Sequence, residues 1–280
     1  MINLVVCADD FGISKESNRA ILNLARLKKI SAVSVLILGN GFHEVDAQNL
    51  KPFSKSIDIG LHLWIPDLAY SEILKGIYLR KLNITFFKEH FEHQIQQFIE
   101  FFGFFPDFID GHYHIHHLPL CKNALLEICK KNSNHEFYVR NTHSRISDIL
   151  KRRASVLKNT LIAHYGKKLK IDLNSHAVPT NFDFIGPYDY ANGATCAQAF
   201  DRYLNTVKHS NTLFNIHPAV NLAAHAPQES FQEGELTPTQ RFAEYDYFVS
   251  DIIDRRLSQF NLKIGRFQHR ASTSTHLNPA

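Results

Sequence analysis

The sequence predicts an α/β fold, with helices packed around a mostly parallel sheet or barrel. Strand-like apolar runs alternate with helical patterns along nearly the whole chain, and no break in composition resembles a linker. Apolar residues make up 44% of the 280 positions and include 22 phenylalanines, which supplies a large core. We therefore expect one domain over residues 1–270, followed by a disordered tail over residues 271–280.

The first half of the chain shows this alternation most clearly. Residues 2–8 form a nearly continuous apolar run, which is typical of a strand buried on both faces. Residues 15–29 show helical periodicity behind a capping Ser14, and residues 31–38 predict a second strand. Residues 56–65 alternate between apolar side chains and a mixed set that includes a histidine, so they predict a third strand.

The second half of the chain continues the pattern less regularly. Helical periodicity returns at residues 88–102 and ends at Gly103, and Pro119 opens another helix. Residues 145–170 are hard to assign, with eight Lys or Arg against one acid, and residues 180–194 resemble an irregular loop. The other predicted elements are strands at 106–116, 136–141, 212–220 and 262–267, and a long helix at 239–260.

The bulk properties exclude several classes of protein. A net charge of only +4 argues against nucleic acid or a membrane as the main partner. The four cysteines form no CxxC pair, which predicts free thiols in a reducing compartment. We find no basic leader before the N-terminal apolar run and no apolar run of about 18 residues that could cross a membrane. These features predict a cytoplasmic protein. The sequence leaves the oligomeric state open, and a homodimer is one possibility because twofold dimers are the commonest oligomers of soluble proteins.

Unusual polar residues follow four of the predicted strands. Asp9 and Asp10 follow the first strand, His62 lies late in the third, and His217 lies at the end of a late strand. A cluster that reads DGHYHIHH, residues 110–117, lies late in the fourth. Because the sites of α/β folds lie at the carboxyl ends of strands, we expect all four groups at one rim.

The histidine cluster suits metal binding if its strand is regular. Alternate side chains of an extended segment share one face, and neutral imidazoles on a rigid element suit a divalent transition metal. Residues i and i+4 lie roughly 13 Å apart on a strand. One histidine would therefore ligate, and its neighbours would support it or contact substrate. The alternative is a solvated strand end. The residues on the shared face would be Asp110, His112, His114 and His116.

The other polar groups have structural explanations when each is taken alone. Asp9 and Asp10 could form a turn and a helix cap, although one carboxylate could instead ligate a metal while the other takes a proton from water. His62 and His217 could be core or edge histidines. In combination, one aspartate and two histidines are a common open metal set that leaves positions for water and substrate.

Four short motifs occur in a fixed order along the chain. They are CADDFG at 7–12, GLHL at 60–63, DGHYHIH at 110–116 and HPA at 217–219. With these spacings the chain resembles the YdjC-like carbohydrate deacetylases, which include chitooligosaccharide deacetylases, over almost its whole length. The resemblance implies a distorted (β/α) barrel of mostly parallel strands, like that of polysaccharide deacetylases.

The resemblance also implies roles for individual residues. One divalent metal ion would be held by Asp10, His62 and His112, with magnesium or zinc favoured and manganese or cobalt as alternatives. Asp9 matches the base proposed for the family, and His217 matches a histidine proposed as the acid.

Arg140 matches a frequent arginine that orients the base or binds substrate. The chain departs from the usual motifs at Cys7, Gly111 and Tyr113, where the family has Asn, Ser and His. None of these departures removes an assigned ligand. The loop after GLHL also differs, which bears on sugar specificity.

The reaction implied by the resemblance is hydrolysis of the N-acetyl group of an amino sugar or oligosaccharide, with release of acetate. The ion would activate water and stabilise the oxyanion, the base would take the proton of the water, and the acid would protonate the leaving amine. The side chains expected to contact the small-molecule sugar are Trp64, Tyr113, His114, His116 and Tyr188.

Three alternatives stay open from the sequence. A metal-dependent phosphoesterase would use a second ion about 3.5–4 Å from the first, and His114 and His116 leave room for it. A sugar-binding relative could have kept the fold and lost catalysis, although the intact carboxylate and histidine motifs argue against this. Residues 145–170 could bind nucleic acid, although a charged stretch is more often a solvated helix face.

Overall fold

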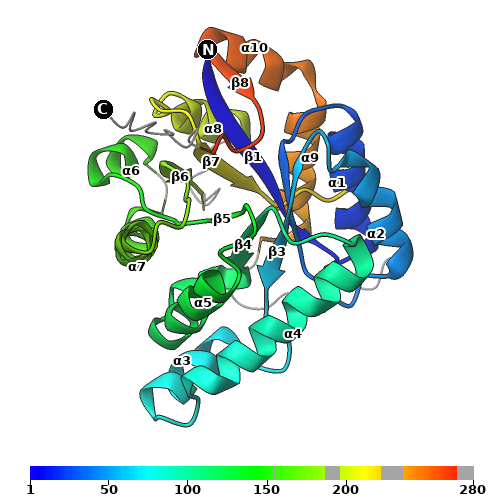
Figure 1. The fold of residues 1–280 in the computed structure, drawn as a ribbon. Helices are drawn as coiled ribbons and strands as arrows, with labels where there is room; N and C mark the ends of the chain where they lie inside the picture. Colours follow the sequence, from blue (N-terminus) through cyan, green and yellow to red (C-terminus); the bar gives the residue numbers. More distant parts are fainter. Residues whose placement is uncertain (154, 187–195, 222–235, 270–280) are drawn as a thin grey trace, which may run out of the picture.

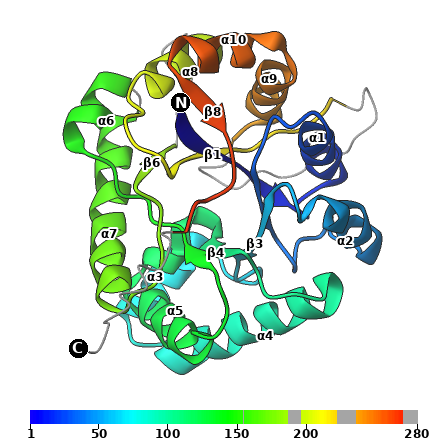
Figure 2. The same cartoon turned by 45° about the horizontal axis from the view of Figure 1, so that its top comes forward.

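The computed structural model describes residues 1–153, 155–186, 196–221 and 236–269. The predictions for the C-terminal tail and for Tyr188 lie outside these residues. Within them, α-helices surround one curled sheet, as Figures 1 and 2 show.

Eight parallel strands form one sheet in the described part of the chain, which confirms the predicted fold class. The path runs β5-β4-β3-β2-β1-β7-β6, so the N-terminal strand β1 lies in the interior of the sheet, and β8 pairs with its first residues. The strands are β1 (Ile2–Phe11), β2 (Ala32–Val35), β3 (Asp58–Leu63), β4 (Phe108–Gly111), β5 (Tyr138–Val139), β6 (Asp183–Ile185), β7 (Thr212–Ile216) and β8 (Leu262–Ile264).

The two end strands of the path approach each other, so the sheet curls into an incomplete barrel. A parallel bridge joins Val139 to Thr180, three residues before β6 begins. Beside it, Asn141 Nδ2 donates a hydrogen bond to the carbonyl of Asn181 at 2.7 Å. Polar side chains therefore connect the two ends of the sheet where regular ladder bonds are missing.

Helices cover the outer face of the barrel (Figure 2). Local signals fix several of their ends. The Ser14 hydroxyl accepts a hydrogen bond from the backbone N–H of Ser17, and Gly103 ends α4 with a φ of 78°. The helices are α1 (Lys15–Arg26), α2 (Glu44–Leu50), α3 (Tyr70–Tyr78), α4 (Ile84–Phe102), α5 (Pro119–Lys131), α6 (Ile146–Arg152), α7 (Val156–Ser175), α8 (Cys196–Leu204), α9 (Pro238–Val249) and α10 (Asp251–Gln259), with 3₁₀ turns η1 (Lys51–Phe53) and η2 (His112–His117).

The strand predicted at 106–116 is wrong in its second half. β4 ends at Gly111, and the chain then turns into η2. Tyr113 and His114 take φ values of 51° and 58°, in the left-handed region. The histidines after Gly111 therefore do not share one strand face with Asp110, as the sequence pattern predicted.

Two other predictions also need correction. The helix expected at 239–260 divides at Ser250, whose hydroxyl accepts a hydrogen bond from Ile252 and caps α10. The irregular loop expected at 180–194 contains the short strand β6, which is too brief to show a period. The basic stretch at 145–170, which the sequence left hard to assign, lies mostly in α6 and α7, as expected of a charged helix face.

No helix in the described ranges combines the length and the apolar character needed to cross a membrane. All four cysteines are free thiols, which confirms that part of the prediction.

Gly60 allows β3 and β4 to pack closely just before the third strand reaches His62. A Cβ atom at this position would lie 2.5 Å from atoms of the Phe108 ring, and that ring is stacked on Tyr138. We expect Gly60→Ala to lower the free energy of unfolding by about 1–3 kcal/mol, because the confined ring cannot move away. Urea unfolding measures this loss. Adding Phe108→Leu should recover part of it, and a Gly60→Ala variant as stable as the wild type would contradict the packing argument.

Candidate metal centre

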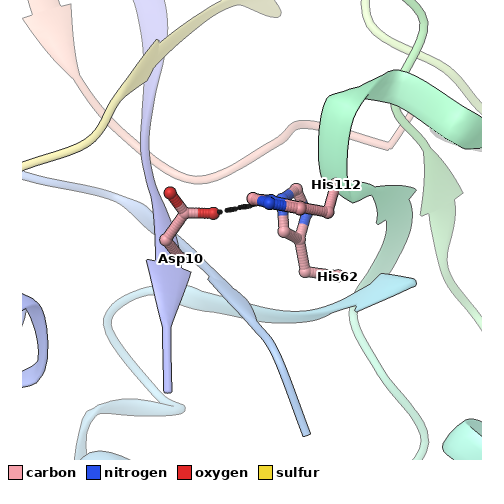
Figure 3. A group of neighbouring side chains, drawn as sticks. All are labelled: Asp10, His62 and His112. Carbon is pink, nitrogen blue, oxygen red and sulfur yellow. Dashed lines mark ion pairs between the residues drawn. The ribbon is translucent and has the colours of Figure 1, made fainter. Parts of the chain in front are cut away.

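Asp10, His62 and His112 come together at the carboxyl ends of β1, β3 and β4 (Figure 3). Asp10 Oδ1 lies 3.0 Å from His112 Nδ1 and 3.6 Å from His62 Nε2. One ligand atom from each residue lies within 4.8 Å of the others, and all three side chains are buried. Such separations suit atoms that share one ion at about 2.1 Å from each. In the described ranges this is the one group of three or more metal-ligating residues.

The adjacent Asp9 and Asp10 both reach the centre because β1 is irregular there. A regular strand would point them to opposite faces. The pairing of β1 with β2 shifts in register between Ala8 and Phe11, and Asp10 takes a positive φ of 66°. Bulges of this kind re-aim side chains next to active sites.

Asp110 and Ser34 set the orientation of His62. Asp110 Oδ1 accepts a hydrogen bond from His62 Nδ1 at 2.5 Å and from the Ser34 hydroxyl at 2.6 Å. Because a carboxylate only accepts, Nδ1 carries the hydrogen and Nε2 directs its lone pair toward Asp10. Both supporting side chains are fully buried. They therefore select the tautomer of His62 that can bind a metal through Nε2.

Arg140 joins this pair to Asp9. Its Nη1 and Nη2 donate to the two oxygens of Asp9 at 2.6 Å each, and Nη2 also lies 2.6 Å from Asp110 Oδ2. Burial alone would raise the pKa of Asp9, but the guanidinium outweighs burial and holds that pKa well below its usual range. Asp9 is therefore ionised at neutral pH. Arg140 has no exposed surface that a substrate could reach. Its contact with Asp9 therefore favours a role in orienting Asp9 over a role in binding substrate.

Helix α9 adds two contacts that the sequence analysis did not predict. Arg241 Nη2 donates to Asp10 Oδ2 at 2.8 Å, which is the second oxygen of that carboxylate. One turn along the helix, Glu244 Oε2 accepts a hydrogen bond from the backbone N–H of His217 at 2.5 Å. An arginine and a glutamate three residues apart are typical of a solvated helix face, so the sequence carried no signal for this role.

His217 lies beside Asp9 at the end of β7. Its Nε2 is 3.9 Å from Asp9 Oδ2. Burial lowers the pKa of His217 to about 4, although Asp10 and Asp9 oppose this shift. The imidazole is therefore neutral at neutral pH and must gain a proton before it can donate one.

Trp64 and Tyr113, which the sequence analysis assigned to sugar contact, border the centre. The Trp64 ring lies 5.9 Å from the ring of His112, and the Tyr113 ring lies 4.2 Å from it. Gln94 fixes the backbone of Trp64 by accepting from its N–H at 3.0 Å and donating to its carbonyl at 2.8 Å. Both rings are partly exposed, so a substrate could reach them.

His114 and His116 do not lie on the rim in the way that a strand would place them. His116 is fully buried, and its Nε2 donates to the carbonyl of Arg140 at 3.0 Å. Burial also lowers the pKa of His116 to about 4, so this histidine is neutral. The ring of His114 packs against Phe184, with 5.6 Å between centroids. His116 thus supports the backbone of Arg140 and leaves no surface for a sugar.

The residues of the centre fit a divalent cation in charge and in donor type. The buried carboxylates of Asp9, Asp10 and Asp110 face the guanidiniums of Arg140 and Arg241. These five side chains carry one excess negative charge, and an uncompensated buried charge is costly. A carboxylate and two imidazole nitrogens are donors that a divalent ion accepts.

Fold and site together define a class of protein. Proteins of this class have a curled parallel barrel. One carboxylate and two histidines meet at the carboxyl ends of its strands, beside an aspartate that an arginine holds. The model of the YdjC-like protein family matches residues 3–259, and the chain belongs to that family. The resemblance seen in the sequence motifs is therefore confirmed.

The chain is also similar to two curated deacetylases. It is 27% identical to the carbohydrate deacetylase of Danio rerio over 149 residues, which cover 45% of this chain and 46% of the relative. It is 30% identical to the chitooligosaccharide deacetylase of Proteus mirabilis over 128 residues, which cover 40% of this chain and 49% of the relative. The chain thus spans about half the length of the curated relatives that it matches.

Two solved structures share the fold. A provisionally assigned cellobiose-phosphate cleavage protein of Enterococcus faecalis V583 superposes with a TM-score of 0.67 at 17% identity, covering 95% of this chain and 97% of that one. A peptidoglycan N-acetylglucosamine deacetylase superposes with a TM-score of 0.50 at 11% identity, covering 96% and 89%. At these identities the likeness concerns the fold alone.

We predict that Asp110→Asn weakens divalent-ion binding about 10–100-fold, because an amide no longer fixes the tautomer of His62. Calorimetric titration of the ion measures this loss, and nitrogen NMR of the imidazole reports the tautomer. Asp58→Asn is the matched control, since Asp58 is a buried aspartate at the start of the same strand as His62. It should leave ion affinity unchanged. Wild-type affinity in Asp110→Asn would show that Asp110 does not support the ligand.

Proposed function

We propose that this protein is a metal-dependent hydrolase that removes the N-acetyl group from an N-acetylated amino sugar or oligosaccharide and releases acetate. The observation that carries the proposal is the convergence of Asp10, His62 and His112 beside Asp9, which Arg140 links to the Asp110 that holds His62. Membership of the YdjC-like family supports the proposal, as do the names of the deacetylases to which the chain is similar.

The proposed cofactor is one divalent ion, with magnesium or zinc favoured, and Asp10, His62 and His112 are the residues that would hold it. Such an ion, when bound, lowers the pKa of water and stabilises negative charge on a carbonyl oxygen. Arg241 occupies Asp10 Oδ2, so this aspartate offers its other oxygen, Oδ1, to the centre.

We assign Asp9 to take the proton of the attacking water, because it is a carboxylate beside the centre that stays ionised. Arg140 fixes both of its oxygens and keeps it ionised. A carboxylate with a lowered pKa holds a proton only briefly, so the proton must move on. His217 is neutral and lies 3.9 Å from Asp9, which makes it the proposed acceptor. Once protonated, its imidazole can donate to the nitrogen that leaves with the sugar.

The aromatic side chains beside the centre suit a sugar substrate. Trp64 and Tyr113 flank His112, and aromatic rings next to a polar site offer apolar faces on which a pyranose can stack. Phosphoester hydrolysis by two ions has less support. His116 is engaged by the carbonyl of Arg140, and the described residues contain no second group of three ligands.

The first test measures ion content and acetate release together, on a panel of N-acetylglucosamine oligomers with and without chelator. The wild type should hold one ion per chain and lose activity with chelator. Asp9→Asn should keep the ion and lose at least about 100-fold in turnover, because the base is gone. His112→Ala should lose the ion.

Equal ion content in His112→Ala and wild type would refute the ligand assignment. Two ions per chain, with turnover of an aryl phosphate and no acetate release, would favour a phosphoesterase instead.

The second test concerns the proton acceptor. His217→Gln should lower turnover by about 100-fold or more while ion content stays at the wild-type level, because the amide cannot accept and return the proton. The backbone contact of this residue with Glu244 does not involve its side chain, so the variant keeps the local fold. Rates of acetate release at saturating sugar measure the effect. Undiminished turnover would remove His217 from the mechanism.

A further inference from the structure

Helices α6 and α7 expose several apolar side chains on the outside of the barrel. Figures 1 and 2 both show the two helices next to each other along one side of the molecule. Leu157 and Leu161 lie on the first turns of α7, and Leu157 is 87% exposed. Single exposed leucines are ordinary, but a larger group of exposed apolar residues on adjoining helices indicates an interaction surface. The exposed apolar residues of the two helices are Ile146, Leu150, Val156, Leu157, Leu161 and Ile171.

The spacing of these side chains places them away from the core. Ile146 and Leu150 are four residues apart on α6, as Leu157 and Leu161 are on α7, so each pair lies on one helix face. The buried residues of α7 lie on the opposite side of the helix. They are Asn159, Ala163, Gly166, Leu169 and Leu173. The two exposed pairs are separated along the chain by a short connection, and α6 packs against α7.

The same helices carry a concentrated positive charge. Residues 145–170 hold eight Lys or Arg against one acid, a formal charge of +7, whereas the whole chain carries only +4. The rest of the chain is therefore net acidic. The single acid, Asp148, is buried and lies 3.7 Å from Lys208. The other acid of these helices is Asp172 near the end of α7, which is partly buried and pairs with Lys122. The exposed cations of this basic face are Arg145, Lys151, Arg153, Lys158, Lys167 and Lys168.

The positive charge and the exposed apolar side chains of α6 and α7 together favour one kind of partner over two others. A second copy of the chain in a symmetric dimer would bring the two basic faces together, which is unfavourable. Nucleic acid would satisfy the lysines but would leave Leu157 and Leu161 without apolar contacts. An anionic lipid surface offers phosphate groups at the level of the lysines and acyl chains just beneath them.

We propose that the face formed by α6 and α7 binds the surface of an anionic phospholipid membrane, with the leucines inserted among the lipids and the lysines at the headgroups. The binding is peripheral and reversible, because the inserted area is small. It is independent of the hydrolase chemistry, since none of these residues belongs to the metal centre.

The test is co-sedimentation of the full chain with vesicles of phosphatidylcholine alone, or of phosphatidylcholine and phosphatidylglycerol in equal parts. The wild type should sediment with the anionic vesicles only, and raised salt should release it. The charge variant Lys151→Glu/Lys158→Glu should weaken binding about 30-fold or more. The apolar variant Leu157→Ser/Leu161→Ser should weaken it at least about tenfold.

Matched controls change the same residue types on another part of the surface. Leu74→Ser/Leu79→Ser removes two exposed leucines of α3 and its C-terminal cap, and Lys55→Glu/Lys81→Glu reverses two exposed lysines. Both controls should bind vesicles as the wild type does.

Failure of the wild type to sediment with anionic vesicles would overturn the proposal. So would wild-type binding by the apolar variant, because the lysines alone would then account for it. A dimer in analytical ultracentrifugation that Leu157→Ser/Leu161→Ser abolishes would assign the face to a second copy. Tight binding of single-stranded RNA that displaces the vesicles and ignores the leucine changes would assign it to nucleic acid.

Discussion

The candidate centre depends on one buried guanidinium. Arg140 has no exposed surface and lies 2.6 Å from both Asp9 and Asp110. Without a cation between them, two carboxylates in this position would be driven toward the protonated form by burial and by mutual repulsion. Because Asp110 also holds His62, the same guanidinium secures the position of a proposed metal ligand and the charge of the proposed base.

The parallel barrel explains how residues so distant in sequence reach one point. The carboxyl ends of neighbouring parallel strands face the same rim, so β1, β3 and β7 deliver Asp10, His62 and His217 to it. The strands of the path β5-β4-β3-β2-β1-β7-β6 are buried along nearly their whole length, and β1 has an irregular register with β2 between Ala8 and Phe11. Near the rim, left-handed backbone occurs at Asp10, Tyr113 and His114, at or just after the ends of β1 and β4. The left-handed positions thus include one proposed ligand, Asp10, and the two residues that directly follow another, His112.

The sequence could indicate the proposed ligands and Arg140, but not the contacts of Arg241 and Ser34 with the centre. Asp10, His62 and His112 each combine a polar side chain with a position at the end of an apolar strand, and their motifs occur in a recognisable order. Arg241 has neither signal, because its contact with Asp10 is a product of tertiary packing. The segment 112–117 misled the prediction for a different reason. Alternating histidine and apolar residues give the same hydropathy pattern in a strand and in a turn with left-handed residues.

Charge balance links the stability of the buried cluster to its proposed chemistry. Asp9 and Asp110 share one guanidinium, and Asp10 has a guanidinium of its own, so one negative charge among these five side chains has no partner. His217 does not supply the missing positive charge at neutral pH, because burial lowers its pKa to about 4. A divalent cation would turn the excess negative charge of the five side chains into an excess positive charge. A carbonyl oxygen that gains negative charge requires such an environment, so the cation that relieves the burial of the carboxylates is also the one that the hydrolysis needs.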